Sequence, residues 1–157
     1  MEFKFTDENL KRIEAARKKY PVSKAAVMDV IYIAQEQNGY ITNEVMDEIA
    51  SVLEIEPVEV MGVVTFYTMF HTKPVGKYHV QVCTNVSCML RGGYEILDQV
   101  VDKLGIQINE VTPDQRFSIE EVECMGSCGT APMIAVNDDY YENLTKEKLI
   151  KLFDSLQ

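Results

Sequence analysis

The sequence has few basic residues, few histidines and no long apolar run. Its 157 residues include 15 lysines and arginines but 25 aspartates and glutamates, so the formal net charge is -10. Nucleic acids and anionic membrane surfaces bind basic patches, and this balance therefore argues against both as partners. The longest mostly apolar stretch, residues 61–70, is far shorter than the roughly 20 residues that span a bilayer. We therefore expect a cytoplasmic protein that does not insert directly into a membrane.

The motifs of nucleotide-binding and nucleophilic enzymes are also absent. The chain has no Gly-x-Gly-x-x-Gly segment after a strand pattern, no phosphate-binding loop, and no serine or cysteine nucleophile with a plausible histidine base. A Rieske centre takes two histidine ligands besides its cysteines, and the histidines here are His71 and His79. His79 alternates with the core positions of a strand pattern, so we expect it to contact solvent or a partner rather than serve in redox chemistry. The sequence therefore predicts no catalytic residue and no nicotinamide or flavin site in this chain.

The four cysteines fall into two pairs. Cys83 and Cys88 have four residues between them, Cys124 and Cys128 have three, and residues 89–123 separate the pairs. Such pairs can hold one small group from two loops, either one metal ion bound by four thiolates or a two-iron cluster with two thiolates per iron. Both spacings lie within the range of structural zinc sites, so zinc stays an alternative. Two disulfides are disfavoured, because small secreted disulfide scaffolds are shorter and richer in cysteine.

The residues around the cysteines favour the cluster over zinc. Gly126 and Gly129 allow the backbone of the second loop to approach the sulfurs, and amide N–H groups directed at sulfur help to set a cluster's potential. Cys88 is expected near the N-terminus of the helix that contains residues 92–93, where a thiolate is stabilised. Residues 131–132 are expected to seal the site from water.

An acidic segment lies beside the second pair. Glu120, Glu121 and Glu123 lie in the residues that lead up to Cys124. Their charge would lower the potential of a nearby cluster, but we interpret the segment as a solvated face of a strand.

Helical spacing of apolar residues extends over the first 75 residues. It predicts a small bundle of helices whose start signals are Thr6, Ser23, Thr42 and Pro57. Asn38-Gly39 is a stop signal. Tyr67 and Phe70 are interpreted as core residues. This region contains no set of ligands, so we expect a scaffold or a docking surface.

After residues 73–76, the spacing of apolar residues changes from the helical period to the alternation of strands. Strands are predicted over residues 78–83, 117–123, 132–136 and 140–144, with a helix from Met89 to Gly105 and another after Thr145. Both cysteine pairs follow strands. The predicted class is α/β: a helical bundle over residues 1–75 and a thioredoxin-like sheet-and-helix domain over residues 76–157.

Several stretches carry a family resemblance. They are residues 62–67 with Phe70, residues 124–128 followed by residues 131–132, and residues 137–141 with residues 144–145. Together with the cysteine spacing, they resemble the thioredoxin-like [2Fe-2S] subunit of NADH:quinone oxidoreductase, respiratory complex I. The same family includes the small iron–sulfur subunits of NAD-linked hydrogenases and formate dehydrogenases. The resemblance extends from about residue 23 to the C-terminus. Gln115 departs from the pattern of the family, because a glycine would suit the turn at this position.

The resemblance implies a role for each cysteine and a partner for the chain. Cys83 and Cys88 would ligate one iron of a [2Fe-2S] cluster, and Cys124 and Cys128 the other. The partner would be a larger flavoprotein that binds FMN and NADH and exchanges single electrons with the cluster. In complex I, the protein would lie in the peripheral arm.

Other assignments stay open at this point. The resemblance also covers the corresponding subunit of an NAD-linked hydrogenase, including electron-bifurcating ones, or of a formate dehydrogenase. A free thioredoxin-like ferredoxin and a zinc-stapled interaction module are further alternatives.

Overall fold

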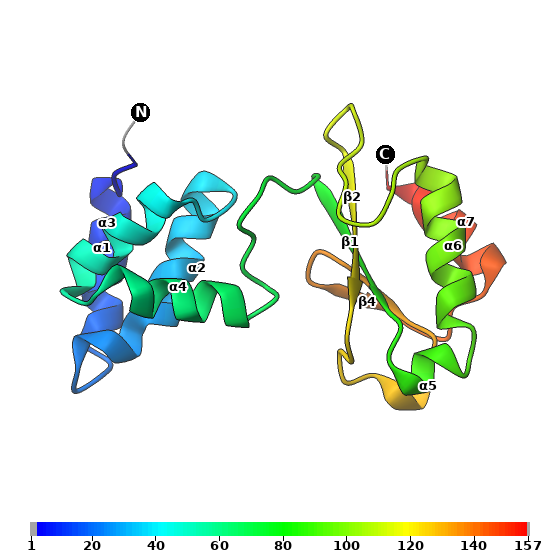
Figure 1. The fold of residues 1–157 in the computed structure, drawn as a ribbon, viewed down its shortest axis with the longest axis horizontal. Helices are drawn as coiled ribbons and strands as arrows, with labels where there is room; N and C mark the ends of the chain where they lie inside the picture. Colours follow the sequence, from blue (N-terminus) through cyan, green and yellow to red (C-terminus); the bar gives the residue numbers. More distant parts are fainter. Residues whose placement is uncertain (1–2, 157) are drawn as a thin grey trace. The chain divides into compact units, whose positions relative to one another are not determined.

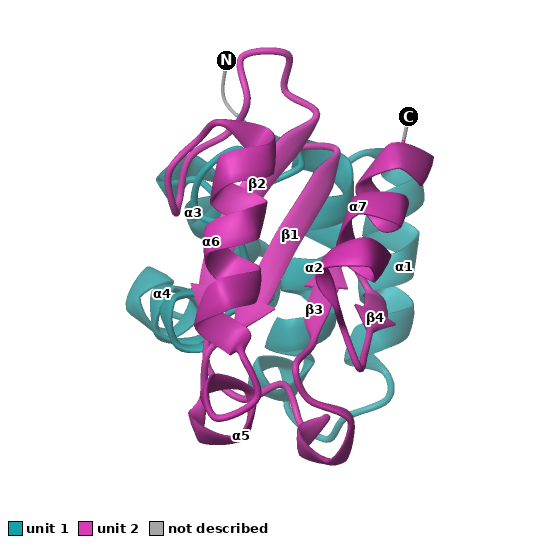
Figure 2. Cartoon of the chain, turned by 90° about the vertical axis from the view of Figure 1, so that its right-hand side faces the viewer, with its two compact units in different colours: residues 1–74 teal, residues 75–157 magenta. Residues whose placement is uncertain are grey.

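The computed structural model describes residues 3–156, and the chain divides into two compact units. Unit 1 contains residues 1–74 and unit 2 contains residues 75–157 (Figure 2). The first is built from helices and the second from a sheet with helices (Figure 1). The α/β class predicted from the sequence is confirmed. Within residues 3–156, no helix is both long and apolar enough to cross a membrane.

Unit 1 follows the predicted start signals with one exception. Its elements are α1 (Asp7–Arg17), the 3-10 helix η1 (Ser23–Ala26), α2 (Val27–Asn38), α3 (Asn43–Leu53) and α4 (Pro57–Phe66). Thr6 and Thr42 cap α1 and α3, because each side chain accepts a hydrogen bond from a backbone N–H of the first turn. Ser23 does not act as a cap. Its hydroxyl donates instead to the carbonyl of Leu53 over 2.7 Å, which ties η1 to the end of α3.

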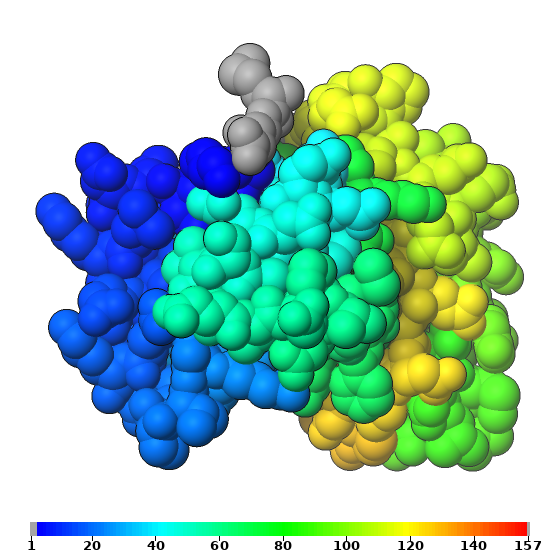
Figure 3. All heavy atoms as spheres, turned by 60° about the vertical axis from the view of Figure 1, so that its left-hand side comes forward, coloured from blue at the N-terminus to red at the C-terminus, as the bar shows by residue number. Residues whose placement is uncertain are grey.

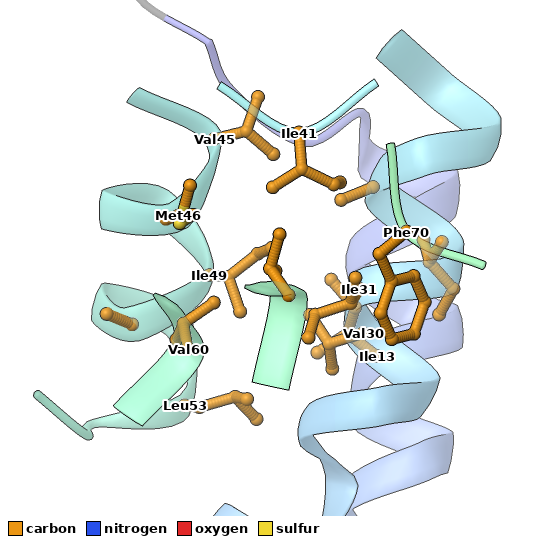
Figure 4. Close-up of a cluster of buried hydrophobic side chains, with 14 of the residues drawn as sticks. Ile13, Val30, Ile31, Ile41, Val45, Met46, Ile49, Leu53, Val60 and Phe70 are labelled. Carbon is orange, nitrogen blue, oxygen red and sulfur yellow. The ribbon is translucent and has the colours of Figure 1, made fainter. Parts of the chain in front are cut away.

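The helices of unit 1 bury one apolar core (Figure 4). Its largest fully buried side chains include Ile31, Ile41 and Ile49. Phe70 is buried as predicted, but the prediction for Tyr67 is wrong, because this residue is 37% exposed. The helical spacing does not reach Tyr67: α4 ends at Phe66, and the backbone of Tyr67 is extended, with φ -98° and ψ 120°.

Unit 2 contains a four-stranded mixed sheet in the order β2-β1-β3-β4. The strands are β1 (Tyr78–Cys83), β2 (Phe117–Val122), β3 (Ile134–Val136) and β4 (Asp139–Tyr141). β1 and β2 are parallel, whereas β3 pairs antiparallel with both β1 and β4. The predicted hairpin of β3 and β4 is confirmed, with residues 137–138 as its turn.

The two hairpin strands are shorter than predicted. Pro132 has no N–H to give to a ladder, and β3 begins only at Ile134. Beyond β4, the N–H of Asn143 donates to the carbonyl of Thr130 and that of Leu144 to the carbonyl of Pro132. These amides therefore hold the loop that follows the second cysteine pair.

Helices α6 (Gly93–Leu104) and α7 (Lys146–Ser155) lie on one face of the sheet, as Figure 2 shows. They bury the apolar side chains of β1 and β2 in a second core. The prediction of a single helix from Met89 is wrong. A short helix α5 (Val86–Met89) precedes α6, and the chain turns between them at Gly92, whose φ is +93°. The break exists because that positive φ is favoured by glycine and does not continue a helix.

Parallel pairing of β1 and β2 determines where the cysteines lie. Parallel neighbours end at the same edge of a sheet. Cys83 is the last residue of β1 and pairs with Val122, the last residue of β2. Cys124 follows two residues later, so both cysteine loops leave the sheet at one edge.

Candidate metal centre

The four cysteines are free thiols in two different environments. Cys83 ends β1 and Cys88 lies in α5, and these residues are only 3% and 2% exposed. Cys124 lies just beyond β2, and Cys128 begins the 3-10 helix η2 (Cys128–Thr130). Both residues of this second pair are exposed. One pair is thus built into the interior of unit 2 and the other is accessible from solvent.

The thiols contact one another within each pair. Cys88 is hydrogen-bonded to Cys83, and the Sγ atoms of Cys124 and Cys128 are 3.4 Å apart. Burial is the largest cause of the raised pKa of Cys88, and Cys128 contributes as the smallest of the causes. Within residues 3–156, no three or more His, Cys, Asp or Glu side chains gather closely enough to hold a single metal ion. The contacts between thiols therefore lie within two pairs.

Apolar side chains surround the first pair. Cys83 and Cys88 form a small buried cluster with Ala131 and Met133, against which Met125 packs. Burial, followed by the hydrogen bond with Cys83, raises the pKa of Cys88 to about 11. A metal that binds here must displace protons from the thiols. Ala131 is 3% exposed and packs within this cluster.

A backbone amide is directed at the second pair. The N–H of Gly126 donates to Cys124 Sγ over 3.4 Å, and Gly126 has a φ of +85° that favours glycine. This hydrogen bond, followed by the one with Cys128, lowers the pKa of Cys124. The contact is of the kind that stabilises sulfur ligands carrying negative charge.

The acidic residues near the end of β2 do more than face solvent. Glu121 Oε1 accepts a hydrogen bond of 2.6 Å from the hydroxyl of Thr84, and the carboxylate of Glu123 accepts one from the side-chain amide of Asn85. Glu121 and Glu123 are exposed, as expected for a solvated face, but their carboxylates also bind the first cysteine loop. Residue spacing could not indicate this contact, because it depends on the parallel pairing of two strands far apart in the chain.

His79 also differs from its prediction. This residue is 7% exposed, its Nδ1 lies 2.8 Å from Ser118 Oγ, and its Nε2 lies 3.0 Å from Glu120 Oε2. The expectation of contact with solvent or a partner overlooks the neighbouring strand. In a strand, successive side chains point to opposite faces of the sheet. His79 therefore lies on the same face as the neighbouring side chains of β2 that it contacts.

The start of α6 packs directly on the first cysteine loop. A Cβ added at Gly93 would lie 2.9 Å from both C and O of Cys88 and 3.0 Å from O of Cys83. Gly93 is therefore a residue of the site without being a ligand. The sequence contains it, but only the close approach of three backbone segments reveals its role.

Comparison with known proteins identifies the family. The sequence model described as thioredoxin-like [2Fe-2S] ferredoxin matches residues 13–157. The chain belongs to the thioredoxin-like [2Fe-2S] ferredoxin family. Among curated relatives of this ferredoxin-family chain, an NADH-quinone oxidoreductase subunit of Rickettsia bellii (strain RML369-C) is 44% identical, covering 99% of this chain and 95% of its own. An NADH-quinone oxidoreductase subunit of Rhizobium meliloti (strain 1021) is 43% identical, covering 92% and 86%.

A solved structure shares the fold. It is a crystal structure of an NAD+-reducing [NiFe]-hydrogenase in the H2-reduced state, with a TM-score of 0.69 and 18% identity. The similarity covers 81% of this ferredoxin-family chain but only 22% of the hydrogenase chain.

Membership of the family supports an iron–sulfur cluster as the cofactor, in preference to zinc. The residues present fit this group. Four free thiols lie in two pairs, on loops that begin at one edge of the sheet. An amide N–H is directed at one sulfur, and apolar side chains surround the buried pair.

Proposed function

We propose that this protein is the [2Fe-2S] electron-transfer subunit of an NADH:quinone oxidoreductase. The observation that carries the proposal is the arrangement of two thiol pairs where the parallel strands β1 and β2 end together. Identity of 43–44% to the two NADH-quinone oxidoreductase subunits, over nearly the whole chain, supports the choice of complex.

Each thiol pair would hold one iron. Cys83 and Cys88 form one ligand pair, and Cys124 and Cys128 form the other. When bound, the cluster would accept and release a single electron. The chain's own residues position it: the buried pair excludes water from one side, and the Gly126 N–H donates toward the charge on sulfur. No bond in a substrate is made or broken by this chain, and it has no nicotinamide or flavin site of its own.

The partner would be the flavoprotein that binds FMN and NADH. Unit 1 offers a surface for docking, because α4 exposes Val58, Met61 and Phe66 on the side away from its core. Figure 3 shows the blue-green atoms of α3 and α4 as a continuous part of the surface of unit 1. Exposed apolar side chains of this size are typical of protein interfaces. The complex would place the protein in a peripheral arm on the cytoplasmic side.

A second apolar area lies beside the thiols. Val86, Met89, Leu90 and Tyr94 are exposed on α5, on the start of α6 and between them, next to Cys88. A partner seated there would approach the cluster closely and exclude water.

The corresponding subunit of an NAD-linked hydrogenase or formate dehydrogenase would need the same surfaces, and the fold shared with the hydrogenase chain supports that alternative. A free ferredoxin would not need them.

Anaerobic purification followed by iron, sulfide and zinc analysis tests the proposal. We expect about two irons and two sulfides per chain and an EPR signal after reduction with dithionite. One zinc per chain without a signal would refute electron transfer and leave a structural metal site. Mixing the reduced protein with the flavoprotein then tests the partner, since flavin absorption should bleach.

A further inference from the structure

Side chains outside the ligand set join the two cysteine loops. Asn85 lies in the first loop between Cys83 and Cys88, and Glu123 directly precedes Cys124. The side-chain amide of Asn85 donates a hydrogen bond to Glu123 Oε2. One contact therefore connects the loop of the buried thiols with the strand end that presents the exposed thiols.

The side chain of Asn85 also organises the helix that carries Cys88. Its Oδ1 accepts a hydrogen bond of 2.9 Å from the N–H of Val86, the first residue of α5. The same side chain thus caps α5 with its oxygen and holds the end of β2 with its nitrogen. Rotation of Asn85 would release both contacts together.

A second bond acts in parallel. The hydroxyl of Thr84 donates to Glu121 over 2.6 Å, and the Thr84 N–H donates to the carbonyl of Val122 over 3.3 Å. Adjacent residues of the first loop therefore hold alternate carboxylates at the end of β2. This pattern restricts sliding of one loop along the other.

We propose that Asn85 and Glu123 are positioning residues that hold the two thiol pairs at the separation the cluster requires. This inference rests on the proposed function. Ligands that are already in place do not lose conformational freedom when the cluster binds, so an ordered pair of loops retains the cluster longer. The bond between an amide and a carboxylate is charge-assisted, which makes it stronger than a neutral contact of the same geometry.

The chain allows a test by reversal of the bond. Asn85→Asp keeps the oxygen that caps α5 but replaces the donor with a carboxylate facing Glu123. Glu123→Gln keeps an acceptor oxygen of the same size. In the double variant, the glutamine amide can donate to the new carboxylate, so the bond returns with its direction reversed.

The main measurement is the rate at which the intact protein loses its visible absorption to excess chelator. We expect Asn85→Asp to accelerate the loss about tenfold or more, which corresponds to the lower end of the range for one charge-assisted bond. Glu123→Gln, which keeps an acceptor but removes its charge, should accelerate the loss less than Asn85→Asp does, and the double variant should return to within about twofold of the wild type. Asn109→Asp, which adds the same charge to an exposed residue elsewhere in unit 2, serves as the matched control.

Hydrogen exchange of the amides of residues 84–90 in the cluster-free protein gives a second measurement. Exchange should rise in Asn85→Asp and fall again in the double variant. Wild-type protein without iron and sulfide would refute the proposed function and this inference together. If the wild-type protein holds a cluster, two results would refute the positioning role alone. One is that Asn85→Asp loses the cluster no faster than the control, and the other is that the double variant loses it as fast as Asn85→Asp.

Discussion

Gly93→Ala is the substitution whose effect can be worked out most directly from the structure. The added methyl group would lie 2.9 Å from C and O of Cys88 and 3.0 Å from O of Cys83. All three are backbone atoms, so no side chain can rotate away. Carbon contacts are optimal at about 3.5–4.0 Å, and α6 or the first cysteine loop must therefore shift by roughly half an ångström or more. Overpacking of this kind costs about 1–3 kcal/mol.

The variant should unfold at a lower temperature and hold less cluster. A loss of about 1 kcal/mol lowers the melting temperature of a domain of this size by about 4–8 °C. Circular dichroism of the cluster-free protein measures this shift, and the iron content measures loading. Gly62→Ala is the matched control, because nothing lies within 4 Å of a Cβ built there and the residue is inside α4. That change should stabilise the protein by about 0.5–1 kcal/mol. If Gly93→Ala were as stable as Gly62→Ala, the argument from close packing would be refuted.

Three further predictions test the ligands, an acidic turn and the docking surface. Cys124→Ser should lose or strongly alter the cluster while the helices of unit 1 stay folded; an unchanged absorption spectrum would contradict the ligand assignment. The hydroxyl of Thr112, followed by the N–H of Arg116, lowers the pKa of Asp114. This carboxylate therefore stabilises the fold above its unfolded pKa and loses that effect as the pH falls through its folded pKa. Asp114→Asn should reduce stability near pH 7, and its difference from the wild type should shrink as the pH falls below about 3.9, the usual pKa of an unfolded aspartate, as urea titrations would measure; a pH-independent difference would exclude the carboxylate as the cause. Phe66 is 77% exposed, so Phe66→Asp should weaken binding to the flavoprotein and leave the melting temperature unchanged; equal binding would exclude this face of α4.

Local signals in the sequence predict much of the fold. The caps at Thr6 and Thr42 lie within one turn of the amides that they bind, and the stop at Gly39 depends on its own φ of +85°. The expectation that a glycine would suit position 115 is confirmed, since Gln115 has a φ of +59°. Each of these features is decided by neighbours in the chain, and the sequence can therefore reveal it.

Predictions fail where a contact depends on partners distant in the chain or on where an element stops. The spacing that makes Tyr67 a core residue assumes that α4 continues, but the helix ends one residue earlier. The alternation around His79 indicates a residue at the surface, because it carries no information on which strand lies alongside. Once β2 lies beside β1 in parallel, Ser118 and Glu120 are within hydrogen-bond distance of that ring.

The candidate site shows the same division. The sequence by itself determined the donor chemistry: four cysteines in two closely spaced pairs, each after a strand, with a glycine able to direct an amide at sulfur. Only the tertiary structure decided that one pair is buried and the other exposed, that Glu123 binds Asn85, and that Gly93 leaves room for the cysteine backbone. Residue type and short spacing are local properties of the chain, whereas these contacts arise from the pairing of β1 with β2 and the packing of α6 against the loop between them.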